Sequence, residues 1–325
     1  MGVYPLFAGG WRGAREPARF LWGCIRMSSP YVRQRRLSNE LAKLLKDNDC
    51  TAEQLAAATR LSKQRISRIM RCRVRPNIEE ILRILNHFDV ERGYRSLIVD
   101  ITRDAQERGW WESHAQEMGV RQATIASLEW GTEEICEYQL NFVPGLLQTE
   151  SYTRARITAD RQIYQATFDA EHVVEARRTR QVLLDRPGGP AYEVVIDELA
   201  LRRPAAPVRV LAAQLDHLVD LGHNHDRIRI LVLPMSAHIR GHAVPRSAFS
   251  IYRYPDSGDP VAVAVDTNTS DQVLIGGDEV QRYLALYARL QEAALSPADS
   301  LDFLAKLAQE LPHEIPEPEG KFDLV

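Results

Sequence analysis

The chain has few cysteines and no long apolar run, and each absence excludes a class of protein. Its 325 residues contain four cysteines, which are scattered and form no CxxC pair. This spacing favours reduced cytosolic thiols over disulfides or a structural zinc site. No apolar run approaches the roughly 18 residues that span a bilayer. We therefore expect a cytoplasmic protein that does not enter a membrane.

Sequence signatures of common enzyme sites are also missing. The chain contains no GxSxG, no P-loop and no GxGxxG motif. Five of its nine histidines fall within residues 217–242, but among them only His223 and His225 are tightly spaced, so surface histidines are favoured over a metal site. Asp197 and Glu198 have no partner nucleophile, which favours a solvated strand end or a salt bridge to Arg202 or Arg203 over an acid/base pair. We expect no catalytic residue, no metal and no cofactor.

Charge is unevenly distributed along the chain. The whole sequence carries a net charge of −3, whereas residues 33–75 carry +8 and the remainder −11. A basic segment on an acidic chain indicates localised contact with phosphates rather than a generally adhesive surface. Hydrophobic residues make up 45% and charged residues 26%, which is ordinary for a globular protein. At this length we expect two domains.

Residues 38–86 have the pattern of four short amphipathic helices separated by tight breaks. The second helix begins with a capping-box spacing, because Gln54 follows Thr51 by three residues. The third helix runs to about Arg71, and Pro76 precedes the fourth. The N-caps expected for the four helices are Ser38, Thr51, Ser62 and Asn77. This order of elements suits a helix-turn-helix that places its third helix in a DNA major groove.

The third helix has two distinct faces. Ile66, Ile69 and Met70 share one side and should pack inward, while Gln and Arg side chains occupy the other. Gln pairs bidentately with adenine and Arg with guanine. We predict base contacts from Lys63, Gln64, Ser67 and Arg68, and base or phosphate contacts from Arg65 and Arg71. Backbone phosphates should be held by Arg35, Arg36, Thr51, Arg73 and Arg75.

The motif TAEQLAAATRLSKQRISRIMRCRVRP, at residues 51–76, resembles the Cro/C1-type (XRE-family) helix-turn-helix. Further motifs follow in one order and are similar to a domain of actinomycete WhiJ-type regulators. They are WWE at 110–112, VPGLLQTESYTRAR at 143–156, RRTRQVLL at 177–184, DELALRR at 197–203, QLDHL at 214–218, LPMSAH at 233–238 and ALSPADS at 294–300. The resemblance implies a DNA-binding regulator that acts with a small partner protein in an antitoxin-like arrangement.

The overall fold class predicted is α+β, with an all-α helix-turn-helix bundle and a larger mixed α/β C-terminal domain. Strands are expected near residues 134–140, 192–196, 228–233, 249–254 and 261–265, separated by helices that do not form a clean βαβ repeat. The expected domains are an N-terminal extension at 1–30, the DNA-binding domain at 31–108, the regulatory domain at 109–311 and a flexible tail at 312–325. Translation is expected to begin at Met27.

Two apolar motifs in the larger domain are either core or a docking site for a partner or ligand. They are Trp110 with Trp111, and the turn formed by Pro144, Leu146 and Leu147. The function predicted is a sequence-specific regulator that binds double-stranded DNA as a homodimer and is modulated through the C-terminal domain by a small partner or ligand. The alternative is an antitoxin-like protein that sequesters a small partner and autoregulates its own operon.

Overall fold

A computed structural model describes residues 28–164, 170–266 and 272–311. Met27 and nearly all of the predicted extension, as well as the predicted tail, lie outside the described residues. Residues 28–30, which were expected to belong to that extension, are part of the fold, since Ser28, Ser29 and Pro30 are all buried. The expected extension therefore reaches three residues too far.

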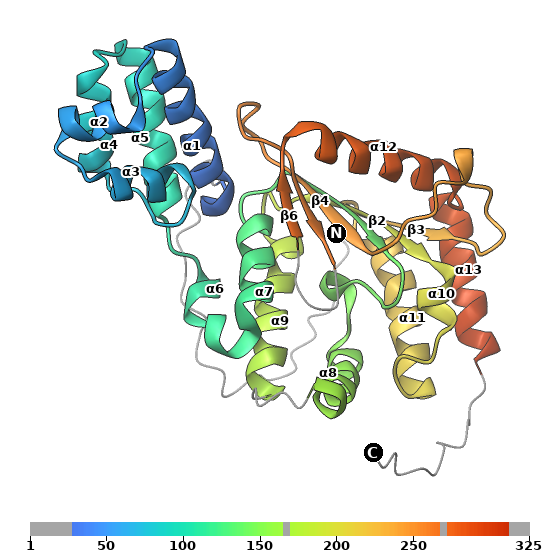
Figure 1. Ribbon diagram of the computed structural model, residues 1–325. Coiled ribbons are helices and arrows are strands. Elements are labelled where there is room, and N and C mark those ends of the chain that lie inside the picture. Colours follow the sequence, from blue (N-terminus) through green and yellow to red (C-terminus); the bar gives the residue numbers. More distant parts are fainter. Residues whose placement is uncertain (1–27, 165–169, 267–271, 312–325) are drawn as a thin grey trace, which may run out of the picture.

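The N-terminal part is a five-helix bundle (Figure 1). Its apolar core is formed by side chains from all five helices, and Leu37, Leu55, Ile66, Ile81 and Ile98 are each at most 1% exposed. This core confirms the expected amphipathic pattern, in which one apolar stripe of each helix faces inward. The helices are α1 (Pro30–Asp47), α2 (Ala52–Thr59), α3 (Lys63–Met70), α4 (Ile78–His87) and α5 (Arg92–Gln106).

Helix α1 begins earlier than the sequence pattern suggested. It starts at Pro30, with Ser29 as N-cap, rather than at Ser38, so the predicted start is wrong by two turns. Proline at the first helical position and a serine before it are favourable for a helix start. Leu37 belongs to the core of the bundle, whereas Val32 belongs to the core of the larger domain. One continuous helix therefore contributes to both cores.

The larger part contains a six-stranded mixed sheet in the order β3-β2-β1-β4-β5-β6. Strands β1, β2 and β3 are parallel. Strand β4 pairs antiparallel with β1, β5 pairs antiparallel with β4, and β6 pairs antiparallel with β5. The strands are β1 (Glu134–Gln139), β2 (Ala191–Asp197), β3 (Ile228–Leu233), β4 (Phe249–Arg253), β5 (Ala262–Val265) and β6 (Gln272–Ile275). This arrangement confirms the α+β class; β6 was not expected from the sequence.

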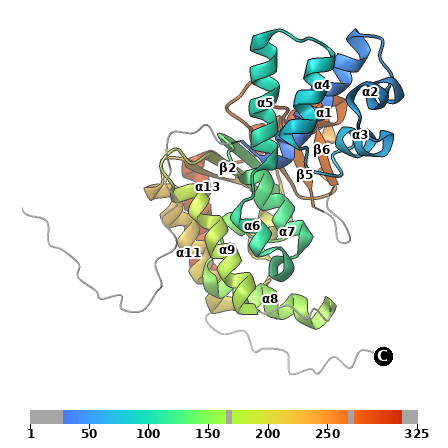
Figure 2. The ribbon, with the colours of Figure 1, turned by 90° about the vertical axis from the view of Figure 1, so that its left-hand side faces the viewer.

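Helices cover both faces of the sheet (Figures 1 and 2). Helix α12 packs on one face, and α8, α9, α11 and α13 lie on the other, with α7 beside α9. The described helices are α6 (Trp110–Ser113), α7 (Ala115–Glu129, interrupted at Gly119), α8 (Glu150–Tyr164), α9 (Ala170–Asp185), α10 (Glu198–Arg202), α11 (Val208–Asn224), α12 (Gly277–Ala293) and α13 (Pro297–Glu310), with 3-10 turns at Gly145–Leu147 (η1) and Arg240–His242 (η2). Within the described ranges, no helix is long and apolar enough to cross a membrane.

Candidate nucleic-acid interface

Helices α2 and α3 form a helix-turn-helix whose geometry is fixed by side-chain caps. Thr51 accepts a hydrogen bond from the Gln54 amide while the Gln54 side chain accepts one from the Thr51 amide, so the predicted capping box is present. Arg60 adopts a left-handed conformation at the turn, with φ of 55°. Ser62 then caps α3 by accepting from the Arg65 amide at 3.1 Å. These contacts set the angle at which α3 leaves the bundle.

The two faces of α3 are those predicted from its sequence. Ile66 and Ile69 are 1% and 4% exposed and anchor the helix to the bundle. Gln64 and Arg68 are exposed. The other predicted contact residues on this surface are Lys63, which pairs with Glu53, Ser67, which is half-buried, and Arg71, which is exposed. Among the residues that the structure describes, Arg68 and Arg71 form no ion pair, so both guanidiniums can meet DNA.

Two of the arginines predicted to contact DNA form ion pairs within the protein. Arg65 makes a bidentate pair with Glu80, with both N–O distances at 2.8 Å, and thereby joins α3 to α4. Arg65 also lowers the pKa of the Glu80 carboxyl through this hydrogen bond. Arg75 pairs with Glu112 of α6, which connects the bundle to the larger domain. Both arginines are partly exposed, but each already has a carboxylate partner in the unbound protein.

The predicted phosphate contact of Arg36 does not fit the structure. Its side chain is 9% exposed, and Nη1 lies 2.7 Å from Asp256 and 3.0 Å from Asp259 in the connection between β4 and β5. Arg33, one turn earlier on α1, pairs with the same two carboxylates. A Cβ at position 258 would overlap the Arg36 guanidinium, so Gly258 permits this close approach. Sequence reasoning missed this buried junction because its partners are about 220 residues apart.

The remaining predicted phosphate contacts lie on the bundle surface. Thr51 and Arg73 are exposed, and Arg35 is half-buried with its guanidinium 5.7 Å from the Tyr31 ring centroid. A hydrogen bond to Tyr31 raises the pKa of Arg35, so this group stays charged. Arg73 follows Cys72, whose φ of 54° turns the chain sharply after α3. These three residues can approach a DNA backbone without rearrangement of the bundle core.

The candidate partner contacts of the larger domain are mostly core residues. Pro144 is buried, and Leu146 and Leu147 are 3% and 0% exposed, which makes the docking interpretation of this turn wrong in this structure. Trp111 is also buried and packs edge-on against Trp130 at 5.4 Å. Trp110 is half-buried. The apolar motif around η1 therefore stabilises the domain, and Trp110 alone of this set retains accessible surface.

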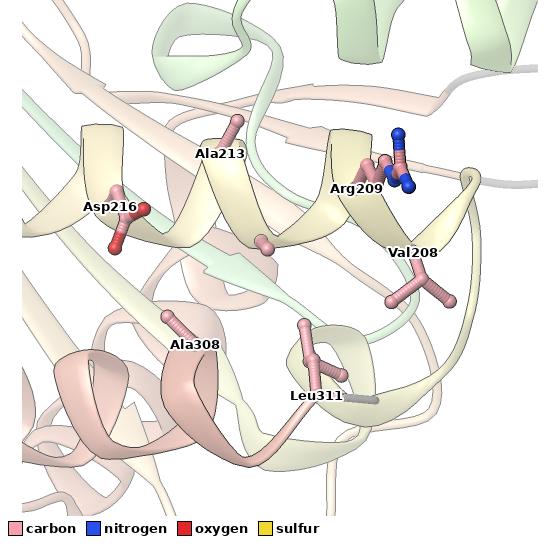
Figure 3. Close-up of a pocket in the computed structure, with 7 residues that line it drawn as sticks. Val208, Arg209, Ala213, Asp216, Ala308 and Leu311 are labelled. Atoms are coloured by element: carbon pink, nitrogen blue, oxygen red, sulfur yellow. The ribbon is translucent and has the colours of Figure 1, made fainter. Parts of the chain in front are cut away.

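Other candidate sites in the larger domain are weak. A hollow of about 410 Å³ lies between α11 and α13, where Val208, Ala308 and Leu311 face the space between the helices (Figure 3). Its walls are mainly small apolar side chains, and few polar groups converge on it. Glu198 forms the expected salt bridge with Arg202. Within the described part of the chain, no group of three or more His, Cys, Asp or Glu side chains is placed to hold a metal ion.

Two protein families match the chain. Residues 41–94 match a family described as helix-turn-helix, and residues 122–306 match one described as domain of unknown function (DUF5753). No curated protein and no solved structure matches the chain. The second match covers more than half of the sequence. The protein therefore belongs to the DUF5753 family, and its XRE-type helix-turn-helix makes it a DNA-binding transcriptional regulator.

Proposed function

We propose that this regulator binds a specific operator in the cytoplasm as a homodimer, with α3 in the major groove, and that a small partner protein or ligand bound by the larger domain changes its DNA affinity. The outward face of α3 carries this proposal. Gln64 and Arg68 are exposed there while Ile66 and Ile69 fix the helix from behind. Such a rigid helix with bidentate side chains can discriminate base pairs.

The shared helix α1 supports a physical route between the two parts. Its first turns are held by Asp256 and Asp259, and its later turns supply Leu37 and Leu41 to the core of the DNA-binding bundle. A change in the larger domain that shifts the connection between β4 and β5 would therefore move the bundle directly. Coupling free energies between linked sites are commonly about 1–3 kcal/mol.

The proposal can be tested by sequencing the genomic fragments that the purified full-length protein retains. A homodimer of this class should select a pseudo-palindrome whose half-sites lie about 34 Å apart, one turn of DNA. Footprinting on the selected fragment should protect two adjacent major grooves. Retention of random fragments with no shared sequence would overturn specific recognition, and a single asymmetric footprint would overturn the dimer.

The antitoxin-like alternative has one supporting feature beside the resemblance to WhiJ-type regulators. Met235 and Val244, in the connection between β3 and β4, are 65% and 72% exposed, which is unusual for large apolar side chains. A stoichiometric small protein that co-purifies with the full chain and is released by Met235→Asp would favour this alternative. In either case the proposed role is binding rather than catalysis, because the chain has none of the nucleophile or phosphate-binding motifs considered above.

A further inference from the structure

The third residue of the WWE motif contacts the DNA-binding bundle rather than the core of its own domain. Trp111 is 4% exposed and packs in an apolar cluster with α7, so it anchors α6 to the larger domain. The next residue, Glu112, accepts from Arg75 with both carboxylate oxygens, and its Oε2 lies 3.2 Å from Arg75 Nη1. The same Oε2 lies 3.9 Å from Arg108 Nε. One carboxylate of the larger domain therefore meets two guanidiniums at the junction with the bundle.

The Glu112 carboxylate has no other task in the fold. Glu80, by comparison, binds a guanidinium of α3 and also accepts from the backbone amide at the start of α4 at 3.2 Å, so it holds that helix end. Among the described residues, the Glu112 carboxylate has no hydrogen bond or ion pair beyond those with Arg75 and Arg108. The side chains of Glu112 and Arg75 are 31% and 35% exposed. Such an accessible ion pair stabilises a fold little and is free to exchange partners.

The backbone at Arg75 is fixed beside the recognition helix α3. Arg65, in the first turn of α3, donates from Nη2 to the Arg75 carbonyl at 3.3 Å, and Gln106, at the end of α5, donates from Nε2 to the Pro76 carbonyl at 2.6 Å. A helix inserted in the major groove meets base edges with its N-terminal residues, and phosphates flank this groove of about 12 Å. The Arg75 guanidinium can therefore reach a flanking phosphate by rotation of its side chain alone.

Arg108 places a second guanidinium at the same carboxylate. Its side chain is 80% exposed, so an approaching anion meets it directly. The planar fork of a guanidinium matches the oxygens of a phosphate as well as those of a carboxylate. Glu112 Oε2 therefore occupies a position between two guanidiniums that suits a phosphate oxygen.

We propose that Arg75 and Arg108 form a binding site for one phosphate of the DNA backbone, and that the Glu112 carboxylate occupies this site in the free protein. DNA has to displace Glu112, so the larger domain lowers the DNA affinity of the bundle. Displacement breaks the contact between the bundle and α6, while the buried junction at α1 stays in place. The inference rests on DNA binding by the bundle, and it gives the proposed regulation a site, because any change that moves α6 alters this competition.

The test is fluorescence anisotropy of the full-length protein with two labelled duplexes at a series of sodium chloride concentrations. One duplex is the operator selected from genomic fragments, and the other has a random sequence of the same length. Glu112→Gln should bind both duplexes about two- to fivefold more tightly at low salt, because the exposed ion pair no longer competes with phosphate. The factor should be the same on both, since a phosphate contact does not read sequence. Glu133→Gln, which removes an exposed carboxylate elsewhere in the larger domain, is the matched control and should bind like the parent protein.

A combined Arg75→Gln and Arg108→Gln variant separates local competition from general repulsion. It should bind both duplexes more weakly, and its plot of log affinity against log salt should be flatter by about 1, as expected when one phosphate contact is lost. Addition of Glu112→Gln to this variant should leave the affinity unchanged, because no guanidinium remains for the carboxylate to occupy. Circular dichroism checks that each variant is folded.

Each outcome decides the proposal. An affinity of Glu112→Gln equal to that of the parent protein overturns it. An equal gain in Glu133→Gln, or an equal gain from Glu112→Gln after removal of both arginines, would assign the effect to general repulsion and would also overturn it. If the combined arginine variant does not fold, the comparison of Glu112→Gln with Glu133→Gln is sufficient. Failure to select an operator would overturn the specific recognition proposed above, whereas the random duplex would still decide whether Glu112 competes with phosphate.

Discussion

Arg68 and Arg36 carry the same charge in opposite surroundings. Arg68 is exposed on α3 and makes no ion pair among the described residues, whereas the Arg36 side chain is 9% exposed and held by two carboxylates. The sequence around each is basic, so composition does not distinguish them. Helical phase does distinguish Arg68, because Ile66 and Ile69 define the buried side of α3. No such local signal reveals that Arg36 faces the larger domain.

Substitution of Arg68 tests the recognition surface directly. Arg68→Ala should weaken operator binding by about 1–3 kcal/mol and relax the preference at one base pair, as expected when a bidentate base contact is lost. Gel-shift titrations on the operator and on its single-base variants would measure both effects. Arg209→Ala, which removes an exposed arginine from α11, is the control and should bind like the parent protein. An equal loss on random DNA would assign Arg68 to phosphate contact instead.

Asp104 of α5, which lies beside Arg33 of α1, makes the stability of the protein depend on pH. It lies 3.3 Å from Arg33, but burial raises its pKa to about 6, and the charges of Glu107, Asp259 and Asp100 act in the same direction. The folded state therefore binds this proton more tightly than the unfolded chain does. Its stabilising contribution is complete below about pH 4, the ordinary carboxyl range, and is lost as the pH rises to about 6.

Asp104→Asn should remove that pH dependence and raise stability at neutral pH by about 1 kcal/mol. Urea unfolding of the full chain at a series of pH values from 4 to 7 would measure the difference. Asp302→Asn, at an exposed position of α13, should leave the pH profile of the parent protein in place. A variant profile as steep as the parent's between these pH values would show that Asp104 is not the titrating group.

At the scale of elements, the turn at residues 144–149 depends on one buried side chain of another helix. Gln214→Leu would leave the Thr149 amide and the Leu147 carbonyl without partners, at a cost of about 2–4 kcal/mol for two buried groups. Chemical denaturation should show the loss as a lower midpoint with an unchanged slope. Asp216→Ala, an exposed position on the same helix, should change the midpoint little. A tolerated Gln214→Leu would mean that the turn repacks or admits water.

Local chemistry predicted the elements of the DNA-binding bundle well. Thr51 with Gln54, Ser62 and Asn77 cap α2, α3 and α4 as expected, because a capping signal lies within four residues of the bond that it makes. The alternating or apolar stretches of β1 to β5 were also recognisable. The parallel pairing of β1 with β2 was not predicted, because no local sequence pattern indicates the register between strands about 57 residues apart. Nor was β6, which is short and polar at its first residue.

The candidate site could likewise be predicted where the sequence signal is local. The exposed and buried sides of α3 follow from its helical period, so the face bearing Gln64 and Arg68 could be predicted. The η1 motif was read as core or docking surface, and burial places Leu146 and Leu147 in the core.

At the scale of the whole molecule, α1 joins the two parts as one continuous helix. Its first turns pack against the larger domain and its later turns against α3 and α5 (Figure 2). Asp259 is central to the attachment: its side chain is 0% exposed, accepts from Ser28 Oγ at 2.6 Å and pairs with both Arg33 and Arg36. Removing one member of such a buried cluster is costly because the remaining charges lose their compensation.

Asp259→Asn should therefore detach α1 from the larger domain while both cores stay folded. Hydrogen exchange should become faster for the amides of residues 33–37, and protection should persist for those of α4 and of strands β1 and β2, whose bonds lie inside the separate cores. Mass-spectrometric exchange on the full chain resolves these segments, and Asp302→Asn, at an exposed position of α13, serves as the control. Equal loss of protection in all segments would mean that the chain unfolds as one cooperative unit. In that case α1 could not transmit a change from the larger domain to the bundle without unfolding both.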